Sequence, residues 1–150
     1  MNLHGPRDHF EPSVSHVIPA LIKKVVDAQD AGVQEIVCWG DGSTTREFLY
    51  SEDAAEEVLL AAERYDGEAP VNLGSGEEHS IAELARIVAQ ACGFNAEVRW
   101  DASKPDGPPR RGLDTSRAEA LFGFKARKIF AEGLRETMKW YRANPVKTRS

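Results

Sequence analysis

The chain has 150 residues, of which 41% are hydrophobic and 29% charged, and its formal net charge is −5. This length suits one domain with its own core. The acidic balance argues against a nucleic-acid-binding protein, which needs a basic face. No apolar run approaches the roughly 20 residues that cross a bilayer, and the first ten residues lack an apolar signal-peptide stretch. We therefore expect a cytoplasmic protein with neither a nucleic-acid nor a membrane partner.

The first predicted elements alternate between helix and strand. Residues 2–6 are predicted to form a loop, and a chain that starts in a loop suggests a cut inside a longer one. Apolar residues at helical spacing predict a helix over 16–31, with Ser15 as its N-cap and Gly32 at its end. Residues 35–39 are typical of a short strand.

An extended segment over 47–50 comes next and leads into a second helix. Ser51 or Asp53 is the expected cap of this helix, which runs through Arg64. Its helical spacing predicts a buried face that consists of Ala54, Ala55, Val58, Leu59 and Ala62.

The C-terminal half repeats the alternation. A strand is predicted over 70–73, and the capping box of Ser80 and Glu83 then opens a helix that ends before Gly93. A third strand is predicted over 97–100. Alternating strands and helices of this kind indicate an α/β fold.

The last third contains a long loop and two helices. Residues 101–112 are rich in proline, glycine and charge, and long ordered loops are often functional. A short helix capped by Thr115 or Ser116 and a final helix over 129–142 follow. The two cysteines, Cys38 and Cys92, lack C-x-x-C spacing. We therefore expect both to be small hydrophobic residues of the core, in a protein of a reducing compartment.

His16 is the first candidate functional residue. It stands at the start of an apolar helix, where the positive helix end disfavours the protonated imidazole. Such a histidine can donate or accept a proton near neutral pH. The alternative is a histidine that only caps the helix or lies on the surface.

Trp39 and Arg46 flank a glycine-rich turn and form the second candidate group. A tryptophan at a strand end can contact a base, and arginine suits phosphate because its planar guanidinium forms two parallel hydrogen bonds. Turns of the Gly-Asp-Gly kind also join strands in many unrelated proteins, so a purely structural role is equally compatible with this segment.

The loop from Lys104 to Arg111 forms the third candidate group. Its prolines stiffen a segment that presents Lys104, Arg110 and Arg111, which indicates a preorganised anion site or, alternatively, a solvated charged loop. By contrast, Gly74-Ser75-Gly76 is not a dinucleotide phosphate cradle, because the third glycine is missing and acidic residues follow.

Several segments occur in an order that resembles one family. They read Asn-Leu-His-Gly-Pro-Arg-Asp-His-Phe, Ser-His-Val-Ile-Pro-Ala-Leu, Trp-Gly-Asp-Gly, Arg-Glu-Phe-Leu-Tyr, Val-Asn-Leu-Gly-Ser-Gly-Glu-Glu and Asp-Ala-Ser-Lys-Pro-Asp-Gly-Pro-Pro-Arg-Arg. Together they resemble the C-terminal portion of GDP-L-fucose synthases, which are extended short-chain dehydrogenases/reductases of the NAD-dependent epimerase/dehydratase family. The resemblance runs from Asn2 to about Asn144.

The resemblance implies a fold and an activity. We expect residues 1–150 to form a single α/β nucleotide-sugar-binding domain, truncated on its N-terminal side and lacking the Rossmann half. The family epimerises the sugar of GDP-4-keto-6-deoxymannose and reduces it with NADPH. A GDP-sugar is therefore the expected substrate, and NADP is the coenzyme of the complete enzyme.

The resemblance also assigns roles to residues. His16 matches the general acid of the epimerisation, and Asn2 and Leu3 match the loop beside the nicotinamide. The positions that match substrate-binding residues are Lys24, Trp39, Arg46, Asp106, Arg110 and Arg111.

Some positions depart from the family pattern. Lys24 stands where arginine is usual, and Arg111 where many members have lysine. His4 replaces a tyrosine and His9 an asparagine. These departures leave the sugar open, and a related nucleotide-sugar epimerase is an alternative.

The reductase machinery that the family implies is missing from this sequence. Its catalytic tyrosine has a lysine four residues on, but Ala54, Ala69 and Pro145 stand at that offset from the three tyrosines. The glycine-rich coenzyme turn is also missing, so we expect no coenzyme to bind and no hydride transfer by this chain alone.

The missing half has a physical consequence for the remaining part. Apolar faces around Val37, Ala55 and Val71 would normally pack on the coenzyme-binding sheet. We therefore expect a homo-oligomer or a complex with a separate N-terminal Rossmann half. A non-catalytic remnant that binds a nucleotide sugar, or only assembles, is the alternative to an enzyme subunit.

Overall fold

The computed structural model describes residues 2–11, 14–95, 97–105 and 107–144. The helices are α1 Val17–Asp30, α2 Ser51–Arg64, α3 Ile81–Ala91, α4 Ser116–Phe122 and α5 Phe130–Ala143. The strands are β1 Asn2–His4, β2 Glu35–Trp39, β3 Thr45–Tyr50, β4 Glu78–Ser80, β5 Glu97–Asp101 and β6 Arg110–Arg111. This mixture of helices and short strands confirms the predicted α/β class. None of the described helices is long and apolar enough to span a membrane.

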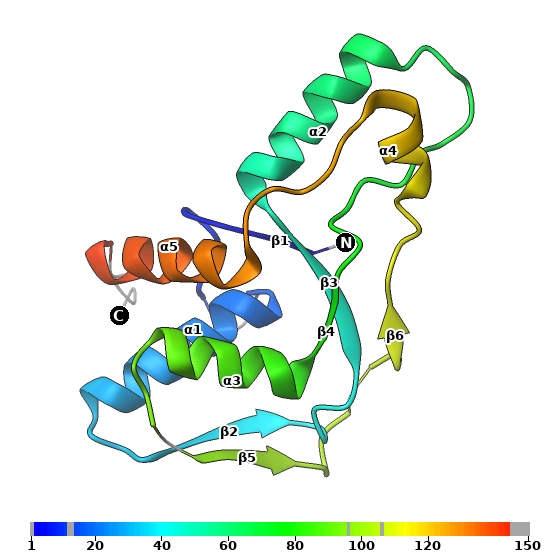
Figure 1. Cartoon of the computed structure of the whole chain (residues 1–150). Helices are drawn as coiled ribbons and strands as arrows, with labels where there is room; N and C mark the ends of the chain where they lie inside the picture. The colour runs from blue at the N-terminus through cyan, green and yellow to red at the C-terminus, as the bar shows by residue number, and fades with distance from the viewer. Residues whose placement is uncertain (1, 12–13, 96, 106, 145–150) are drawn as a thin grey trace.

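Strand β3 is the centre of the main sheet. Its second half pairs in parallel with β1, with His4 opposite Tyr50. Its first half pairs antiparallel with β4 and parallel with β6. The other sheet consists of the parallel pair β2 and β5, which lies under α1 and α3 in Figure 1.

The alternation of side chains along β3 separates two lobes. Phe48 points into the larger lobe, whose core joins α1, α3 and α5 and includes Ile18, Ile22, Val25, Leu84, Val88 and Leu134. Leu49 points the opposite way into the smaller lobe, whose core joins α2 and α4 and includes Ala118, Phe122 and Phe124. Figure 1 shows the smaller lobe extending away from the larger one.

Most predicted helices are present, with shifts at their ends. Ser80 caps α3 as predicted, because its hydroxyl accepts a hydrogen bond from the Glu83 amide at 3.0 Å. Gly32 follows the C-cap of α1 with a positive φ of 67°, as expected of a helix-ending glycine. The prediction of Ser15 as N-cap is wrong, because His16 holds that position, without a side-chain cap bond.

The predicted cap of α2 is also wrong, and so is its predicted buried face except for Ala54. Tyr50 is the N-cap, and the Asp53 carboxylate instead accepts from the amides of Arg127 and Lys128. Val58 and Leu59 are 56% and 65% exposed, and Ala55 and Ala62 are exposed as well. The inward side carries Ala54, Leu60, Ala61, Asp53 and Glu57.

Three strand predictions also need correction. Residues 2–6 begin with β1 rather than a loop, because Asn2–His4 pairs with β3. Residues 70–73 form no strand; the Asn72 side chain donates to the Asp114 carbonyl there, and the short strand β4 comes later. The predicted 101–112 loop contains the short strand β6, which forms by pairing with β3.

Candidate anion-binding site

Two predicted arginines occupy paired positions where β3 and β6 run side by side. Arg46 and Arg111 are register partners in this parallel pair, and the Thr45 amide donates to the Pro109 carbonyl at 2.9 Å just before it. Register partners in a sheet project from the same face. In the described part of the chain, neither guanidinium forms an ion pair with an acidic side chain. Two like charges in register repel each other, and an anion bound between them relieves that repulsion.

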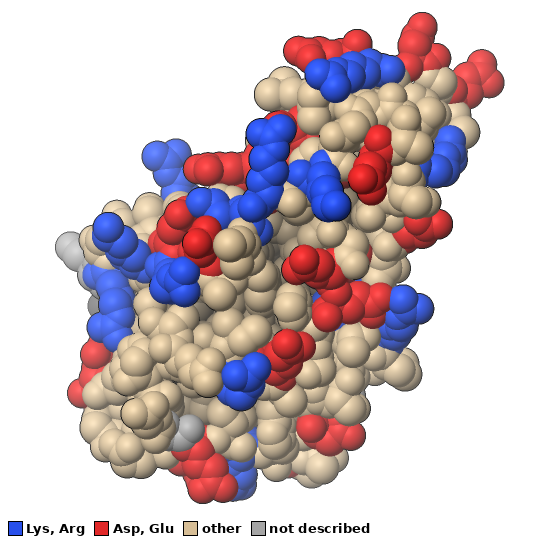
Figure 2. Space-filling view, in the orientation of Figure 1, with Lys and Arg blue, Asp and Glu red and all other residues tan. Residues whose placement is uncertain are grey.

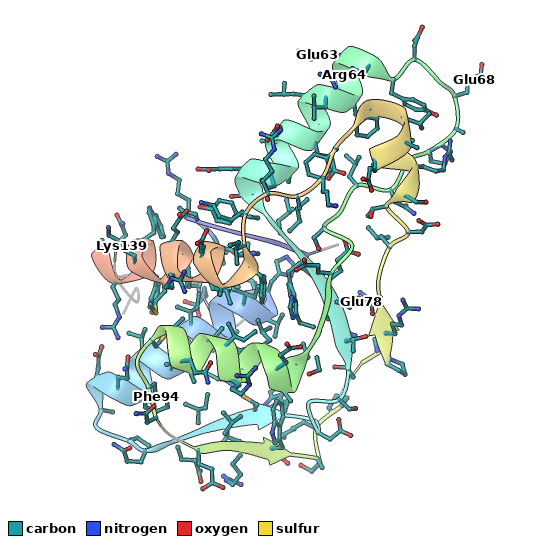
Figure 3. The ribbon with its side chains drawn as sticks, in the orientation of Figure 1. Glu63, Arg64, Glu68, Glu78, Phe94 and Lys139 are labelled. Carbon is teal, nitrogen blue, oxygen red and sulfur yellow. The ribbon has the colours of Figure 1, made fainter. Side chains whose placement is uncertain are left out.

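Arg110 faces the opposite side of β6 and is already engaged. Its guanidinium contacts both carboxylate oxygens of Glu78, with Nε 3.0 and 2.9 Å from them. Glu78 lies on β4 near β6, as Figure 3 shows. The pKa of the Glu78 carboxyl is lowered, chiefly by the hydrogen bond from Arg110. Arg110 therefore joins two strands in this structure, whereas Arg111 forms no such ion pair with any residue that the structure describes.

Trp39 and Arg46, both expected to bind the nucleotide sugar, line the same pocket. This pocket has a volume of about 270 Å³ and is also lined by Asn2, Thr44 and Pro105. The Trp39 ring is 62% exposed, and the Lys104 ammonium lies 5.9 Å from its centroid. An exposed indole beside the cationic side chains of Lys104 and Arg46 offers a surface on which a base can stack.

His16 lies in a neighbouring pocket of about 390 Å³ together with Asn2 and Leu3. The His16 side chain is exposed, and the Asn2 amide donates to the Glu47 carbonyl at 3.2 Å. The structure thus brings the expected general acid, His16, together with Asn2 and Leu3, the two residues expected beside the nicotinamide. Asn2 lines both pockets and connects the expected acid with the expected phosphate site.

Like Arg110, the predicted site residue Lys24 does not join this group. The Lys24 ammonium donates to the Val37 carbonyl at 2.8 Å and lines a different pocket, with Val33 and Glu35. Asp106 lies outside the described residues.

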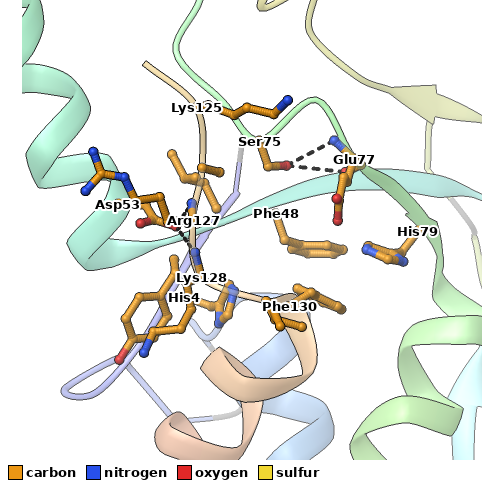
Figure 4. A pocket seen from close by; sticks show the side chains of 14 residues that line it. His4, Phe48, Asp53, Ser75, Glu77, His79, Lys125, Arg127, Lys128 and Phe130 are labelled. Carbon is orange, nitrogen blue, oxygen red and sulfur yellow. Dashed lines mark hydrogen bonds between the residues drawn. The ribbon is translucent and has the colours of Figure 1, made fainter. Parts of the chain in front are cut away.

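A further cavity, which the sequence did not suggest, opens between the lobes. It has a volume of about 340 Å³, and basic and acidic side chains surround the hollow on the face shown in Figure 2. The His79 ring stacks on Phe130 at 4.3 Å between centroids, and the His4 ring meets Phe130 edge-on (Figure 4). His4 is 2% exposed, and burial lowers its pKa to about 4. His4 therefore stays neutral at physiological pH.

No sequence signal marked His79 as part of this cavity. In the structure it is the register partner of Arg46 across β3 and β4.

The cysteines lie in apolar surroundings. Cys38 is buried in the larger core, and Cys92 packs against that core. Burial raises the pKa of both thiols, that of Cys92 to about 11. Neither is therefore an acid or base near neutral pH.

The glycine-rich turn of this chain does not fit a coenzyme pyrophosphate. Its backbone amides already donate to carboxylates of the chain itself, Gly74 to Glu57 at 3.3 Å and Gly76 to Glu47 at 3.1 Å. A second anion at these donors would meet two buried acids.

Comparison with known proteins agrees with these features. The family model described as "NAD dependent epimerase/dehydratase family" matches residues 1–74. GDP-L-fucose synthase 1 of Arabidopsis thaliana is 43% identical over 143 residues, which cover 95% of this chain and 44% of that protein. The GDP-L-fucose synthase of Escherichia coli is 39% identical and is covered to 47%.

A solved structure extends the agreement to the fold. The GDP-L-fucose synthetase of Naegleria fowleri bound to NADP superposes with a TM-score of 0.90 at 32% identity, over 99% of this chain and 47% of that one. The chain is therefore similar, in sequence and in fold, to the C-terminal portion of GDP-L-fucose synthases. Its first 74 residues match the NAD-dependent epimerase/dehydratase family model. The chain spans less than half the length of these proteins.

Proposed function

We propose that this chain is the nucleotide-sugar-binding part of a GDP-L-fucose synthase-like, NADPH-dependent epimerase/reductase, and that it transfers no hydride alone. The observation that carries the proposal is that Arg46, which lines the Trp39 pocket, is the register partner of Arg111. A diphosphate offers several oxygens to two guanidiniums, while the indole offers a face to the base. GDP-sugars are the expected ligands because the similar full-length proteins are named for a GDP-sugar product.

His16 is the proposed proton donor to the sugar. Its imidazole is exposed and shares a pocket with Asn2, which also lines the pocket of Arg46. A sugar held by its diphosphate near Arg46 would therefore extend toward His16. Asn2 and Leu3 would contact the nicotinamide of NADP, which supplies the hydride when the coenzyme-binding half is present.

The missing chemistry supports inactivity of the chain alone. No tyrosine of the sequence has a lysine four residues on. The amides of the glycine-rich turn are occupied by Glu47 and Glu57. The chain can thus bind and orient a substrate, but it lacks groups for hydride transfer.

A partner is expected at β1 and α2. Among the described strands, β1 pairs only with β3. Leu3 of β1 is 45% exposed, and α2 exposes Val58 and Leu59. An open strand edge next to an uncovered apolar helix face suits a separate Rossmann half, which would add parallel strands, or a second copy of this chain. Light scattering that shows a well-behaved monomer without any partner would count against this part of the proposal.

The second candidate is a non-catalytic remnant that binds a nucleotide sugar or only assembles. The same exposed face on α2 favours it, because a homo-oligomer would bury this face without any coenzyme half. Addition of a family Rossmann half decides between the two. Restored NADPH oxidation with a GDP-4-keto-6-deoxy sugar supports the enzyme subunit, and oligomers without turnover support the remnant.

Calorimetry with GDP and GDP-mannose tests the binding site itself. We expect binding that disappears in Arg46→Ala and persists in Arg110→Ala, because Arg110 faces the other side of β6 and contacts Glu78. Absence of heat with both ligands would refute the retained nucleotide site and leave only the assembly role.

A further inference from the structure

Glu47 is a buried acid in the strand that carries Arg46. Its side chain is 1% exposed. One carboxylate oxygen accepts from the Gly76 amide at 3.1 Å, and the other accepts from the Leu113 amide at 2.8 Å. Backbone amides rather than a cation therefore satisfy this buried charge, and a buried carboxylate without such donors would be strongly destabilising.

The glycine-rich turn is shaped around this carboxylate. A Cβ atom at Gly74 would overlap Glu47 Oε1, so any side chain there would have to displace the carboxylate that this turn binds. Gly76 has a φ of 74°, which favours glycine as well. The Gly-Ser-Gly sequence lacks the pattern of a coenzyme-binding turn. In this structure it binds the carboxylate of Glu47 instead.

The second amide is important for β6. This strand has only two residues, Arg110–Arg111, and both are exposed. Its start is held by the bond from the Thr45 amide to the Pro109 carbonyl, and Leu113, bound by Glu47, lies two residues beyond Arg111. Besides its pairing with β3, the strand has the Arg110–Glu78 ion pair, whose guanidinium is solvent-exposed, and exposed ion pairs contribute little to stability.

We propose that Glu47 is a positioning residue that keeps Arg111 beside Arg46. By holding Leu113 and Gly76 together, its carboxylate fixes β6 against β3 and preorganises the two guanidiniums for the phosphates of a ligand. Preorganisation lowers the ordering cost that a mobile arginine would otherwise add to binding. The ligand part of this inference rests on the proposed nucleotide-sugar function, whereas the placement of β6 does not.

Glu57 provides a matched control. It is buried like Glu47 and accepts from the same turn, through the Gly74 amide, but it has no bond to the segment after β6. Glu57→Gln therefore changes the turn without changing the support of Arg111.

The first measurement is amide hydrogen exchange in the 150-residue chain without ligand. In Glu47→Gln the side chain retains one acceptor for two amide donors, so we expect Arg111 and Leu113 to exchange about tenfold faster or more, with α3 unchanged. Glu57→Gln should not accelerate them. Unchanged protection of Arg111 and Leu113 in Glu47→Gln would overturn the proposal.

The second measurement compares GDP with guanosine by calorimetry. We expect Glu47→Gln to weaken GDP about tenfold and to leave guanosine, which has no phosphate, unaffected. Equal losses for both ligands would contradict positioning through the arginine pair. If the unmodified chain binds no GDP while exchange behaves as expected, the proposed function fails and the placement role stands. Should Glu47→Gln not fold, Glu47→Asp, whose carboxylate is one methylene closer to the backbone and so no longer matched to both amides, undergoes the same two measurements.

Discussion

The two lobes on either side of β3 are stabilised in different ways. In the larger lobe, the α1, α3 and α5 helices turn their apolar faces inward, and Leu84, Val25 and Val88 are almost completely buried. In the smaller lobe, α2 turns two acids, Asp53 and Glu57, inward and leaves Val58 and Leu59 exposed. The larger lobe thus has a closed core, whereas the smaller lobe depends on buried polar contacts and leaves an apolar face uncovered.

This difference shows which lobe buries its apolar side chains without a partner. Asp53 and Glu57 each hold a loop through backbone amides, of Arg127 and Lys128 in one case and of Gly74 in the other. Such contacts fix loops near the site and add little apolar burial. The exposed face of α2 is the surface at which we propose a second half or second copy.

The largest change in the free energy of unfolding is expected from a substitution in the core of the larger lobe. Leu84→Ala removes a fully buried side chain from the larger lobe and should lower the free energy of unfolding by about 3 kcal/mol. Chemical denaturation followed by circular dichroism measures this loss. A loss below about 1 kcal/mol would mean that the larger lobe is loosely packed, contrary to the comparison.

In the smaller lobe, substitution of Glu57 is expected to change the free energy of unfolding by a comparable amount that depends on pH. Burial raises the pKa of Glu57 from 4.5 to about 7, so the folded state binds more protons between these values and loses stability as pH rises. Relative to the unmodified chain, Glu57→Gln should be equally stable near pH 4.5 and gain up to about 3 kcal/mol above pH 7.

The same denaturation series, repeated at several pH values, provides the test. His4 acts in the opposite direction, because its pKa of about 4 costs stability as pH falls below 6.5. Since both proteins contain His4, its contribution cancels in the difference. A gain for Glu57→Gln that is independent of pH would show that Glu57 is not a buried acid with a raised pKa.

The smallest effect on stability is expected at the exposed face. Leu59→Ser should change the free energy of unfolding by no more than about 0.5 kcal/mol, because Leu59 is 65% exposed. The same change should weaken self-association or capture of a Rossmann half, as measured by sedimentation velocity. Strong destabilisation of a monomeric chain would instead place Leu59 in a core.

Local signals made much of the fold predictable. The Ser80 cap depends on residues three apart, and the apolar spacing of α1 and α5 identifies their buried sides. Most of the buried face of α2 was predicted wrongly. Helical periodicity shows which residues form an apolar face, but it does not show whether another part of the chain packs on that face. The two-residue strand β6 escaped prediction because it depends on distant partners, Thr45 and Glu47.

The candidate site shows the same limit. Residue types in a known order were enough to suggest Trp39 and Arg46, which line one pocket. The sequence did not distinguish Arg110 from Arg111, because their opposite directions follow from strand pairing. His79 and Glu47 escaped notice because their roles arise from contacts across the sheet and with the turn.

The central claim, that Arg46 and Arg111 together bind a diphosphate, is tested most directly by phosphorus NMR of GDP during titration with the chain. We predict that both phosphorus resonances shift on binding, and that the shift is lost in Arg46→Ala and Arg111→Ala but retained in Arg110→Ala. Guanine protons that broaden while both phosphorus resonances stay in place would contradict the account, because the ligand would then be held by its base alone.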